Sequence, residues 1–174
     1  MLSHSNLLAA GRYISSGHDV DHKDVALCVL PIYHINGLCV TVMGTLVSAS
    51  TLVIPYRFSV GAFWGLIEKH RCSWFSAVPT QYSYILHHKE MPEKISCLRF
   101  ARSASAPLSP DIHRKFEERF NVPIIETMGL TETGSQISTN PLPPKTRKIG
   151  SPGKAHGNKL MIGNDINDEV TRGI

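Results

Sequence analysis

Residues 126–134 read Glu-Thr-Met-Gly-Leu-Thr-Glu-Thr-Gly and combine carboxylates, hydroxyls and glycines in one short segment. A buried strand is predicted over residues 122–127, and open α/β sheets bind ligands at the carboxyl ends of their strands. Gly129 permits a tight turn and a close approach of the backbone to a ligand. Thr131 offers a hydroxyl and an N–H to a phosphate oxygen, and Glu132 offers a carboxylate that can hold Mg²⁺ beside it. The alternative is an ordinary glycine turn with a capping threonine.

Three more side chains are candidates for chemistry. His34 lies between a predicted strand and a predicted helix, where a histidine either faces a ligand or bonds a backbone carbonyl. Arg102 precedes Ser103 at a strand end, where it either meets a substrate carboxylate or pairs with an acid of the protein. His87 and His88 have no such setting and are predicted to be surface residues.

Residues 129–157 are rich in Thr, Ser, Gly and Pro and contain no convincing helix, which predicts a long loop. No acidic residue occurs from 133 through 164. A basic loop of this kind is either an anion site or a solvated surface loop. The cations that accumulate in it are Lys145, Arg147, Lys148, Lys154 and Lys159.

The elements that must position these residues follow from the alternation of short apolar runs with helical stretches. Strands are predicted over residues 25–30, 51–54, 73–78, 98–102 and 122–127, with a short one over 159–163. Helices are predicted over residues 6–16, 36–48, 60–70, 81–89 and 110–120, with Ser5, Ser59 and Ser109 as N-caps. This alternation predicts an α/β fold, a mostly parallel sheet with helices on both faces.

Length and composition exclude several classes of protein. A chain of 174 residues with 42% hydrophobic and 18% charged residues forms a core and is neither disordered nor a coiled coil. Lys plus Arg exceed Asp plus Glu by 18 to 14, and aromatic residues are 7%, which argues against a nucleic-acid partner. The longest apolar stretch, residues 37–49, is too short for a membrane span. Nothing in the sequence indicates an oligomeric state.

The cysteines indicate a reducing compartment. They form no CxxC pair and stand in apolar surroundings, which predicts free, buried thiols rather than a zinc site or a disulfide framework. No signal peptide is visible at the N-terminus, so we expect a cytoplasmic protein. The four are Cys28, Cys39, Cys72 and Cys97.

Five segments together resemble the adenylate-forming enzymes, the family of AMP-forming acyl-CoA synthetases, luciferases and peptide-synthetase adenylation domains. Residues 128–132 are similar to the family's Tyr-Gly-x-Thr-Glu motif. Four further segments resemble the family's motifs in the family's order: Leu-Pro-Ile-Tyr-His-Ile-Asn-Gly (30–37), Val-Pro-Thr (78–80), Ser-Ala-Ser-Ala-Pro-Leu (103–108) and Gly-Ser-Pro-Gly-Lys (150–154). The resemblance covers essentially the whole chain. Residues 102–105 and 135–143 look closest to the oxalate–CoA ligase type.

The resemblance implies a ligase that activates a carboxylate with ATP to acyl-AMP and transfers the acyl group to coenzyme A. It implies that Thr131 contacts the α-phosphate, that Glu132 ligates Mg²⁺ and that His34 lies between the acyl and thiol pockets. It further implies an adenine site and an acid site. The adenine site comprises Ser105, Ala106, Pro107, Met128, Gly129 and Thr131, and the acid site comprises His34, Arg102, Ser103 and Ala104.

Two departures from the family are visible. Met128 stands where the family has a tyrosine, and it lacks the π-face that stacks on adenine. The family's phosphate loop and its small C-terminal domain, which carries a lysine, have no counterpart in these 174 residues. We therefore expect a single partial domain, the central part of an AMP-binding domain. The expected substrate is a short polar or dicarboxylic acid, and the alternative is a non-catalytic product that binds a nucleotide or a partner.

Overall fold

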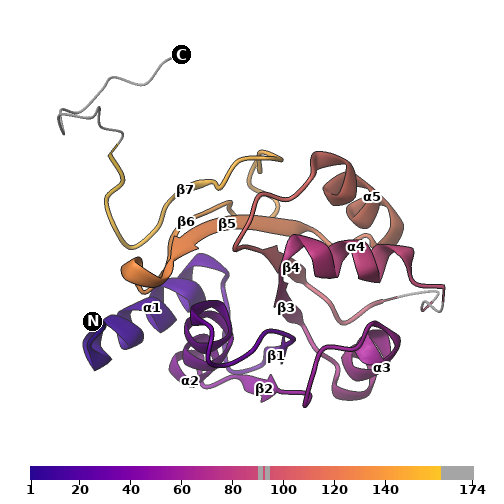
Figure 1. Cartoon of the computed structure of the whole chain (residues 1–174), viewed down its shortest axis with the longest axis horizontal. Coiled ribbons are helices and arrows are strands. Elements are labelled where there is room, and N and C mark those ends of the chain that lie inside the picture. The colour runs from indigo at the N-terminus through magenta and orange to yellow at the C-terminus, as the bar shows by residue number, and fades with distance from the viewer. Residues whose placement is uncertain (90–91, 93–94, 162–174) are drawn as a thin grey trace.

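A mostly parallel sheet forms the centre of the computed structural model, which describes residues 1–89, 92 and 95–161 (Figure 1). The described residues form a seven-stranded sheet in the order β2-β1-β3-β4-β5-β6-β7. Strands β1 to β5 pair in parallel, whereas β6 pairs antiparallel with both β5 and β7. The strands are β1 (Val25–Cys28), β2 (Thr51–Val53), β3 (Trp74–Ala77), β4 (Phe100–Ser103), β5 (Ile124–Leu130), β6 (Ser135–Thr139) and β7 (Lys154–Ala155).

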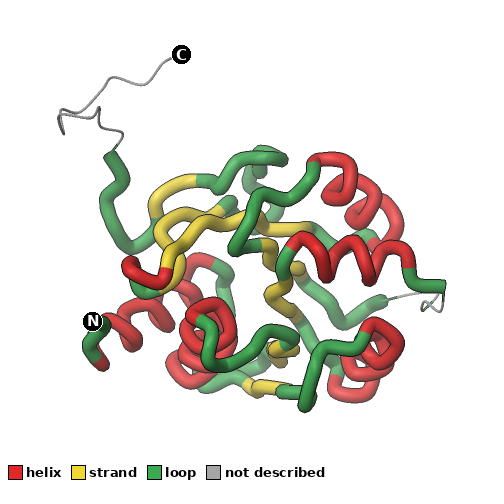
Figure 2. Tube along the Cα trace, viewed as in Figure 1, coloured by secondary structure: helices red, strands yellow, loops and turns green. Residues whose placement is uncertain are grey.

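Helices cover both faces of the parallel part of the sheet, which confirms the predicted α/β class (Figures 1 and 2). One group lies on the left in Figure 1 and the other on the right. The first group is α1 (His4–Gly17), the π-helix η1 (Asn36–Met43) and α2 (Gly44–Ser48). The second group is α3 (Val60–His70), α4 (Pro79–His87) and α5 (Pro110–Phe120).

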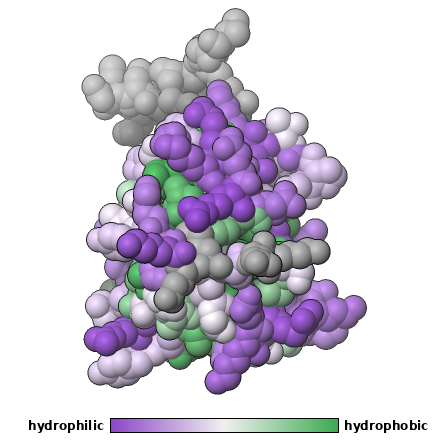
Figure 3. Space-filling view, turned by 90° about the vertical axis from the view of Figure 1, so that its right-hand side faces the viewer, coloured by the Kyte–Doolittle hydropathy of each residue, from purple (hydrophilic) through white to green (hydrophobic). Residues whose placement is uncertain are grey.

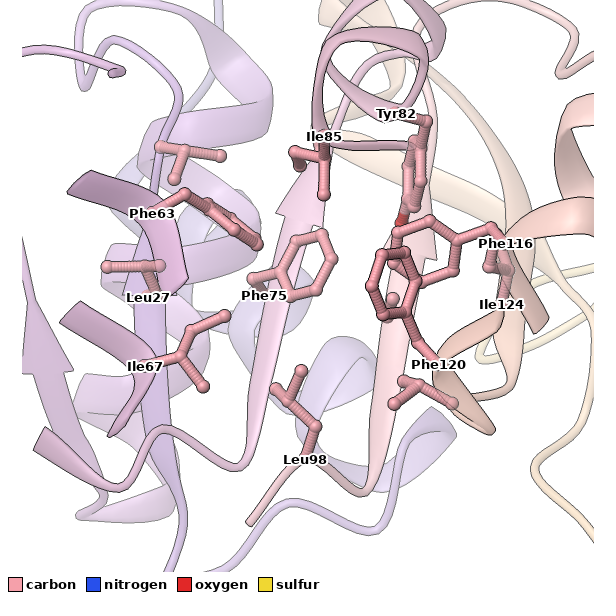
Figure 4. Packing of buried hydrophobic residues seen from close by; sticks show 14 of the residues in the cluster. Leu27, Phe63, Ile67, Phe75, Tyr82, Ile85, Leu98, Phe116, Phe120 and Ile124 are labelled. Carbon is pink, nitrogen blue, oxygen red and sulfur yellow. The ribbon is translucent and has the colours of Figure 1, made fainter. Parts of the chain in front are cut away.

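The hydrophobic core is divided by the sheet. On the side of α3, α4 and α5, aromatic rings from strands and helices interlock around Phe75, whose ring centroid is 5.0 Å from that of Phe63 (Figure 4). On the opposite side, Trp74 and Phe100 stack with centroids 5.6 Å apart beneath Ile14 of α1. Because both faces are covered, strands β1, β3 and β4 carry buried residues on both sides, as their continuous apolar runs predict.

The predicted helices are confirmed, with shifted ends. Helix α1 is capped by Ser3 rather than Ser5, because Ser3 and Asn6 form a reciprocal capping box. Ser59 and Ser109 occupy N-cap positions, but their side chains make no capping hydrogen bond. Helix α4 begins at Pro79, two residues before the predicted start, since proline is well suited to the first helical position.

The predicted loop over residues 129–157 is wrong over residues 129–139 and again at the short strand β7. Strand β5 continues to Leu130, a short 3₁₀ turn η2 (Thr131–Thr133) follows, and β6 then returns antiparallel beside β5. Residues 159–161 are not in a strand, and the remainder of the strand predicted over 159–163 lies outside the described residues.

The side of the molecule formed by α3, α4 and α5 is mostly hydrophilic, with small apolar areas between the polar side chains (Figure 3). Within the described ranges, no helix is long and apolar enough to cross a membrane. All four cysteines are free, three of them buried and Cys97 half-buried. His87 is exposed as predicted, whereas His88 is half-buried.

Candidate active site

The segment with the sharpest chemical signal runs through the end of β5 and the turn into β6. Gly129 lies in the strand beside a register shift, and a Cβ at this position would be 1.9 Å from the carbonyl oxygen of Ser135. The glycine is therefore required by the close approach of β6, the chain's own backbone. This differs from the expected close approach of a ligand.

Thr131 and Glu132 lie in the turn η2 that follows β5, and both side chains are exposed. Within the described part of the chain, Glu132 makes no ion pair or hydrogen bond through its carboxylate. A single unengaged carboxylate fits Mg²⁺, which takes one or two protein carboxylates and fills its other positions with water and substrate phosphates. No group of three or more metal-ligating side chains occurs among the described residues.

A cavity of about 210 Å³, here called the His34 cavity, opens beside this turn. It brings together residues that are far apart in the sequence, from the segment after β1, from β4 and from the β5–β6 turn. His34 is exposed on its wall, and its Nδ1 accepts a long hydrogen bond of 3.4 Å from the Asn36 N–H. The lining residues are His34, Ile35, Asn36, Arg102, Ala104, Ser105, Gly129, Leu130, Thr131, Glu132 and Ser135.

A second cavity of about 370 Å³, here called the Met128 cavity, adjoins the first. The two share Ser105, Gly129 and Leu130 on their walls, so they meet where β5 ends. Met128 is 42% exposed and presents an apolar side chain to this second space. Its other lining residues are Ser103, Ala106, Pro107, Glu126, Thr127, Gly150 and Pro152.

Arg102 and Ser103 are adjacent in the sequence and belong to one predicted acid site, but they line different cavities. Successive side chains of a strand point to opposite faces of a sheet, and Arg102 and Ser103 follow this rule on β4. Arg102 lines the His34 cavity, whereas Ser103 lines the Met128 cavity, and the buried hydroxyl of Ser103 has no hydrogen-bond partner among the residues that the structure describes.

Arg102 is 1% exposed and is held by neutral groups. Its Nη1 donates to Asn36 Oδ1 and Ser76 Oγ, both at 3.1 Å, and its Nη2 donates to Gln136 Oε1 at 3.2 Å. The expected alternative, a pair with an acid, is absent among the described residues. Burial lowers the pKa of Arg102 to about 9, so the guanidinium remains charged at neutral pH.

Sequence analysis did not single out the partners Asn36, Ser76 and Gln136. The sequence gives only a weak indication that these three residues are functional. Each is a polar residue in a buried segment. A buried polar residue needs a partner, so Ser76 in the middle of an apolar strand is the clearest of the three.

A buried charge cluster lies behind the Met128 cavity. His113 of α5 bonds Glu126 of β5 at 2.9 Å and Glu117 at 3.0 Å, and Glu126 also accepts the N–H of Gly150 at 2.8 Å. Burial opposes the charged form of His113, but these two carboxylates outweigh it and raise the pKa of His113. Burial likewise disfavours ionised Glu117, but bonds from His113 and Arg147 lower its pKa to about 2.

The five cations of the basic loop do not all take part in one anion site. Arg147 Nη1 donates to Glu117 Oε1 at 2.5 Å and to the Ile124 carbonyl oxygen at 3.0 Å. These bonds connect the loop to α5 and β5. The lysines of the loop are exposed and do not line either cavity. They are Lys145, Lys148, Lys154 and Lys159.

Comparisons with known proteins identify the family and the fold of the chain. The AMP-binding enzyme family matches residues 1–173. Sulfoacetate–CoA ligase of Cupriavidus necator is 44% identical over 93% of this chain, and oxalate–CoA ligase of Saccharomyces cerevisiae is 34% identical over 97%. The crystal structure of ATP-bound MatB from Rhodopseudomonas palustris superposes over the whole chain with a TM-score of 0.90 at 28% identity.

The chain spans about a third of the length of these proteins, namely 32%, 31% and 34% of them. The match to the family nevertheless extends over nearly every residue of the chain. The sequence motifs, the mostly parallel sheet and the paired cavities thus lead to one assignment: the chain belongs to the AMP-binding enzyme family.

Proposed function

We propose that these residues form the central part of the AMP-binding domain of an AMP-forming carboxylic acid–CoA ligase. In that reaction a carboxylate oxygen attacks the α-phosphorus of ATP, and pyrophosphate leaves to give acyl-AMP. The deprotonated thiol of coenzyme A then attacks the acyl carbon, and AMP leaves to give the thioester. The observation that carries the proposal is the junction of two cavities at the end of β5, next to the Thr131–Glu132 turn, where the Met128 cavity is the more apolar of the two.

The nucleotide is assigned to the Met128 cavity, with Ser105, Ala106, Pro107, Met128 and Gly129 around the adenine. Thr131 follows at the junction, where its hydroxyl can donate to the α-phosphate. Glu132 would hold Mg²⁺. The positive charge of the ion would stabilise the negative charge that shifts among the phosphate oxygens during the reaction.

The acid is assigned to the His34 cavity. Donors surround this space: the imidazole of His34 and the guanidinium of Arg102, with Ala104 between the strand and the loop. Ser103 would contact the bound reactants from the adjoining cavity. A small cavity with several polar side chains on its wall favours a short polar or dicarboxylic acid, and the sulfoacetate– and oxalate–CoA ligases named above support that choice.

A cytoplasmic location completes the proposal, because free thiols persist in a reducing compartment. The alternative function is a non-catalytic product that binds a nucleotide or a partner protein.

The test is acid-dependent exchange of labelled pyrophosphate into ATP by a full-length ligase that carries these residues. A panel should include oxalate, malonate, sulfoacetate, acetate, hexanoate and a cinnamate. Exchange with at least one acid supports the ligase, and a thioester product after addition of coenzyme A completes the assignment. If no acid promotes exchange while ATP still binds, the non-catalytic alternative is correct.

A further inference from the structure

Glu126 is a buried carboxylate on the wall of the Met128 cavity. It is 7% exposed, and it is the only acidic residue among the described residues that line this cavity. Its Oε1 lies 2.9 Å from His113 Nδ1 and accepts the N–H of Gly150 at 2.8 Å. A carboxylate in this position opposes the binding of an anionic nucleotide unless a nearby cation balances its charge.

His113 of α5 supplies that cation. It is 1% exposed, and its second ring nitrogen, Nε2, lies 3.0 Å from Glu117 Oε1. An ionised carboxylate only accepts hydrogen bonds, so both ring nitrogens of His113 must carry a proton, as they do in the charged imidazolium. Burial opposes this charged form, but the bonds to Glu117 and Glu126 outweigh it and raise the pKa of His113.

The charges around His113 balance only while His113 is charged. Glu117 has a second cation, Arg147 of the loop after β6, whereas His113 is the only cation that forms an ion pair with Glu126 in the described part of the chain. Tyr82 of α4 also interacts with both carboxylates, but burial raises its pKa well above the ordinary value and its hydroxyl is neutral. Two carboxylates and two cations cancel, so loss of the proton of His113 leaves a net negative charge beside the Met128 cavity.

The same carboxylate also fixes part of the cavity wall. Gly150 and Pro152 line the Met128 cavity, and the bond from the Gly150 N–H to Glu126 holds this turn against β5. Helix α5 is thus connected through His113 and Glu126 to the wall at residues 150–152. If Glu126 turns away from an uncharged His113, this part of the wall loses its contact with the sheet.

We propose that His113 is a positioning residue for the nucleotide, because its charged form holds Glu126 in place and balances the charge that Glu126 brings to the Met128 cavity. This inference rests on the proposed function and deepens it, since it requires ATP to bind in that cavity. His113 itself lines neither the His34 cavity nor the Met128 cavity and acts through Glu126. The affinity for the nucleotide should therefore fall as the pH rises through the pKa of His113, which lies above 6.5.

The test measures the KM for ATP from pH 6.5 to about pH 9 in a full-length ligase that carries these residues. In the wild type this KM should rise by about 5-fold over the interval, because the surroundings of the cavity gain a negative charge. His113→Gln should already have the higher KM at pH 6.5 and should show no further rise, while its KM for the acid stays within about 2-fold of the wild type. His22→Gln, at an exposed histidine before β1, is the matched control and should keep the wild-type profile.

A second variant separates the balance of charge from support of the fold. Glu126→Gln removes the carboxylate that His113 balances, so its KM for ATP should not rise with pH even if the variant melts at a lower temperature. A constant KM for ATP in the wild type overturns the inference without any variant. His113 is only structural if His113→Gln melts lower but keeps the wild-type rise, or if it raises the KM for ATP and the KM for the acid equally at every pH.

The outcomes for the two proposals are distinguishable. If the wild type is an active ligase whose KM for ATP does not depend on pH, the inference about His113 is wrong and the ligase assignment stands. If the wild type activates no acid, the proposed function fails, and calorimetric titration with ATP over the same pH interval decides the inference. Binding that weakens with pH in the wild type but not in Glu126→Gln supports it, whereas undetectable binding or equal pH dependence in both overturns it.

Discussion

Glu132 shows how much of the chemistry depends on one unengaged side chain. It is exposed on a short turn and makes no bond through its carboxylate within the described ranges, so nothing in the fold requires its charge. We expect Glu132→Gln to keep the shape and lose the metal. In a full-length ligase the adenylation half-reaction should fall by about 100-fold or more, measured by pyrophosphate exchange.

The thioester half-reaction is the internal control for Glu132. When it is started from preformed acyl-AMP, the variant should lose much less activity, because the phosphate transfer has already occurred. Glu118→Gln, an exposed carboxylate on α5, should affect neither step. Equal losses in both half-reactions would instead mean that Glu132 supports the fold.

Residue types and spacing predicted a set of candidate site residues, but not which of their side chains line the same cavity. His34, Arg102 and Thr131, which the resemblance divides between an acid site and an adenine site, line one cavity. Ser103 lies in the other, because strand alternation turns it away from its neighbour. The network around Arg102 is assembled from η1, β3 and β6, and such long-range contacts leave no local pattern in a sequence.

At the scale of elements, the hairpin of β5 and β6 is the clearest case of structure hidden from hydrophobic pattern. Strand β6 reads Ser-Gln-Ile-Ser-Thr, and four of its five residues are buried although they are polar. Gln136 accepts a hydrogen bond from Arg102 and Thr139 bonds His18, whereas Gln136 Nε2 and the Ser138 hydroxyl have no hydrogen-bond partner among the described residues. A method that seeks alternating apolar residues therefore interprets this strand as a loop.

The close approach within this hairpin gives a stability prediction. Gly129→Ala would place a methyl group 1.9 Å from the Ser135 carbonyl oxygen, so the two strands would have to separate. We expect a loss of at least about 3 kcal/mol in the free energy of unfolding, measured by urea denaturation. The matched control is Gly65→Ala in α3, where no described atom other than the helix's own neighbouring backbone and the adjacent residues lies within 4 Å of the added carbon.

Gly65→Ala should raise the free energy of unfolding by about 0.5–1 kcal/mol, because alanine is the better helix former. If the free energy of unfolding falls for Gly129→Ala and rises for Gly65→Ala, the close contact, and not the loss of a glycine itself, determines the change in stability. A Gly129→Ala variant as stable as the wild type would contradict the register of β5 and β6.

At the scale of the whole molecule, one charge cluster connects the helical layer, the sheet and the loop after β6. Glu117 accepts from His113, from Arg147 and from the Ile124 N–H at 2.6 Å. Its pKa is about 2 in the folded chain against 4.5 for the free side chain. Its contribution is therefore fully present above pH 4.5 and is lost as the pH falls toward 2.

The expected result is a loss of up to about 3 kcal/mol in the free energy of unfolding between pH 4.5 and 2. Glu117→Gln should be less stable at neutral pH and should lose less of its stability over that interval. His113 contributes with the opposite sign: its pKa is raised above 6.5, so its stabilisation is present below 6.5 and fades as the pH rises through the folded value. Identical pH profiles for Glu117→Gln and the wild type would exclude this assignment.

The last prediction concerns the 174 residues by themselves. They span about a third of their relatives' length, and the hydrogen-bond donors that line their His34 cavity include Arg102, Thr131 and Asn36. Phosphate transfer requires several donors and cations already in position, and loss of a single such donor typically costs 100- to 1,000-fold. We expect these residues to fold, as judged by circular dichroism, and to catalyse no acid-dependent pyrophosphate exchange. The full-length ligase assayed beside them is the positive control. Exchange above a no-protein blank would show that this one sheet with its two cavities contains the complete adenylation machinery.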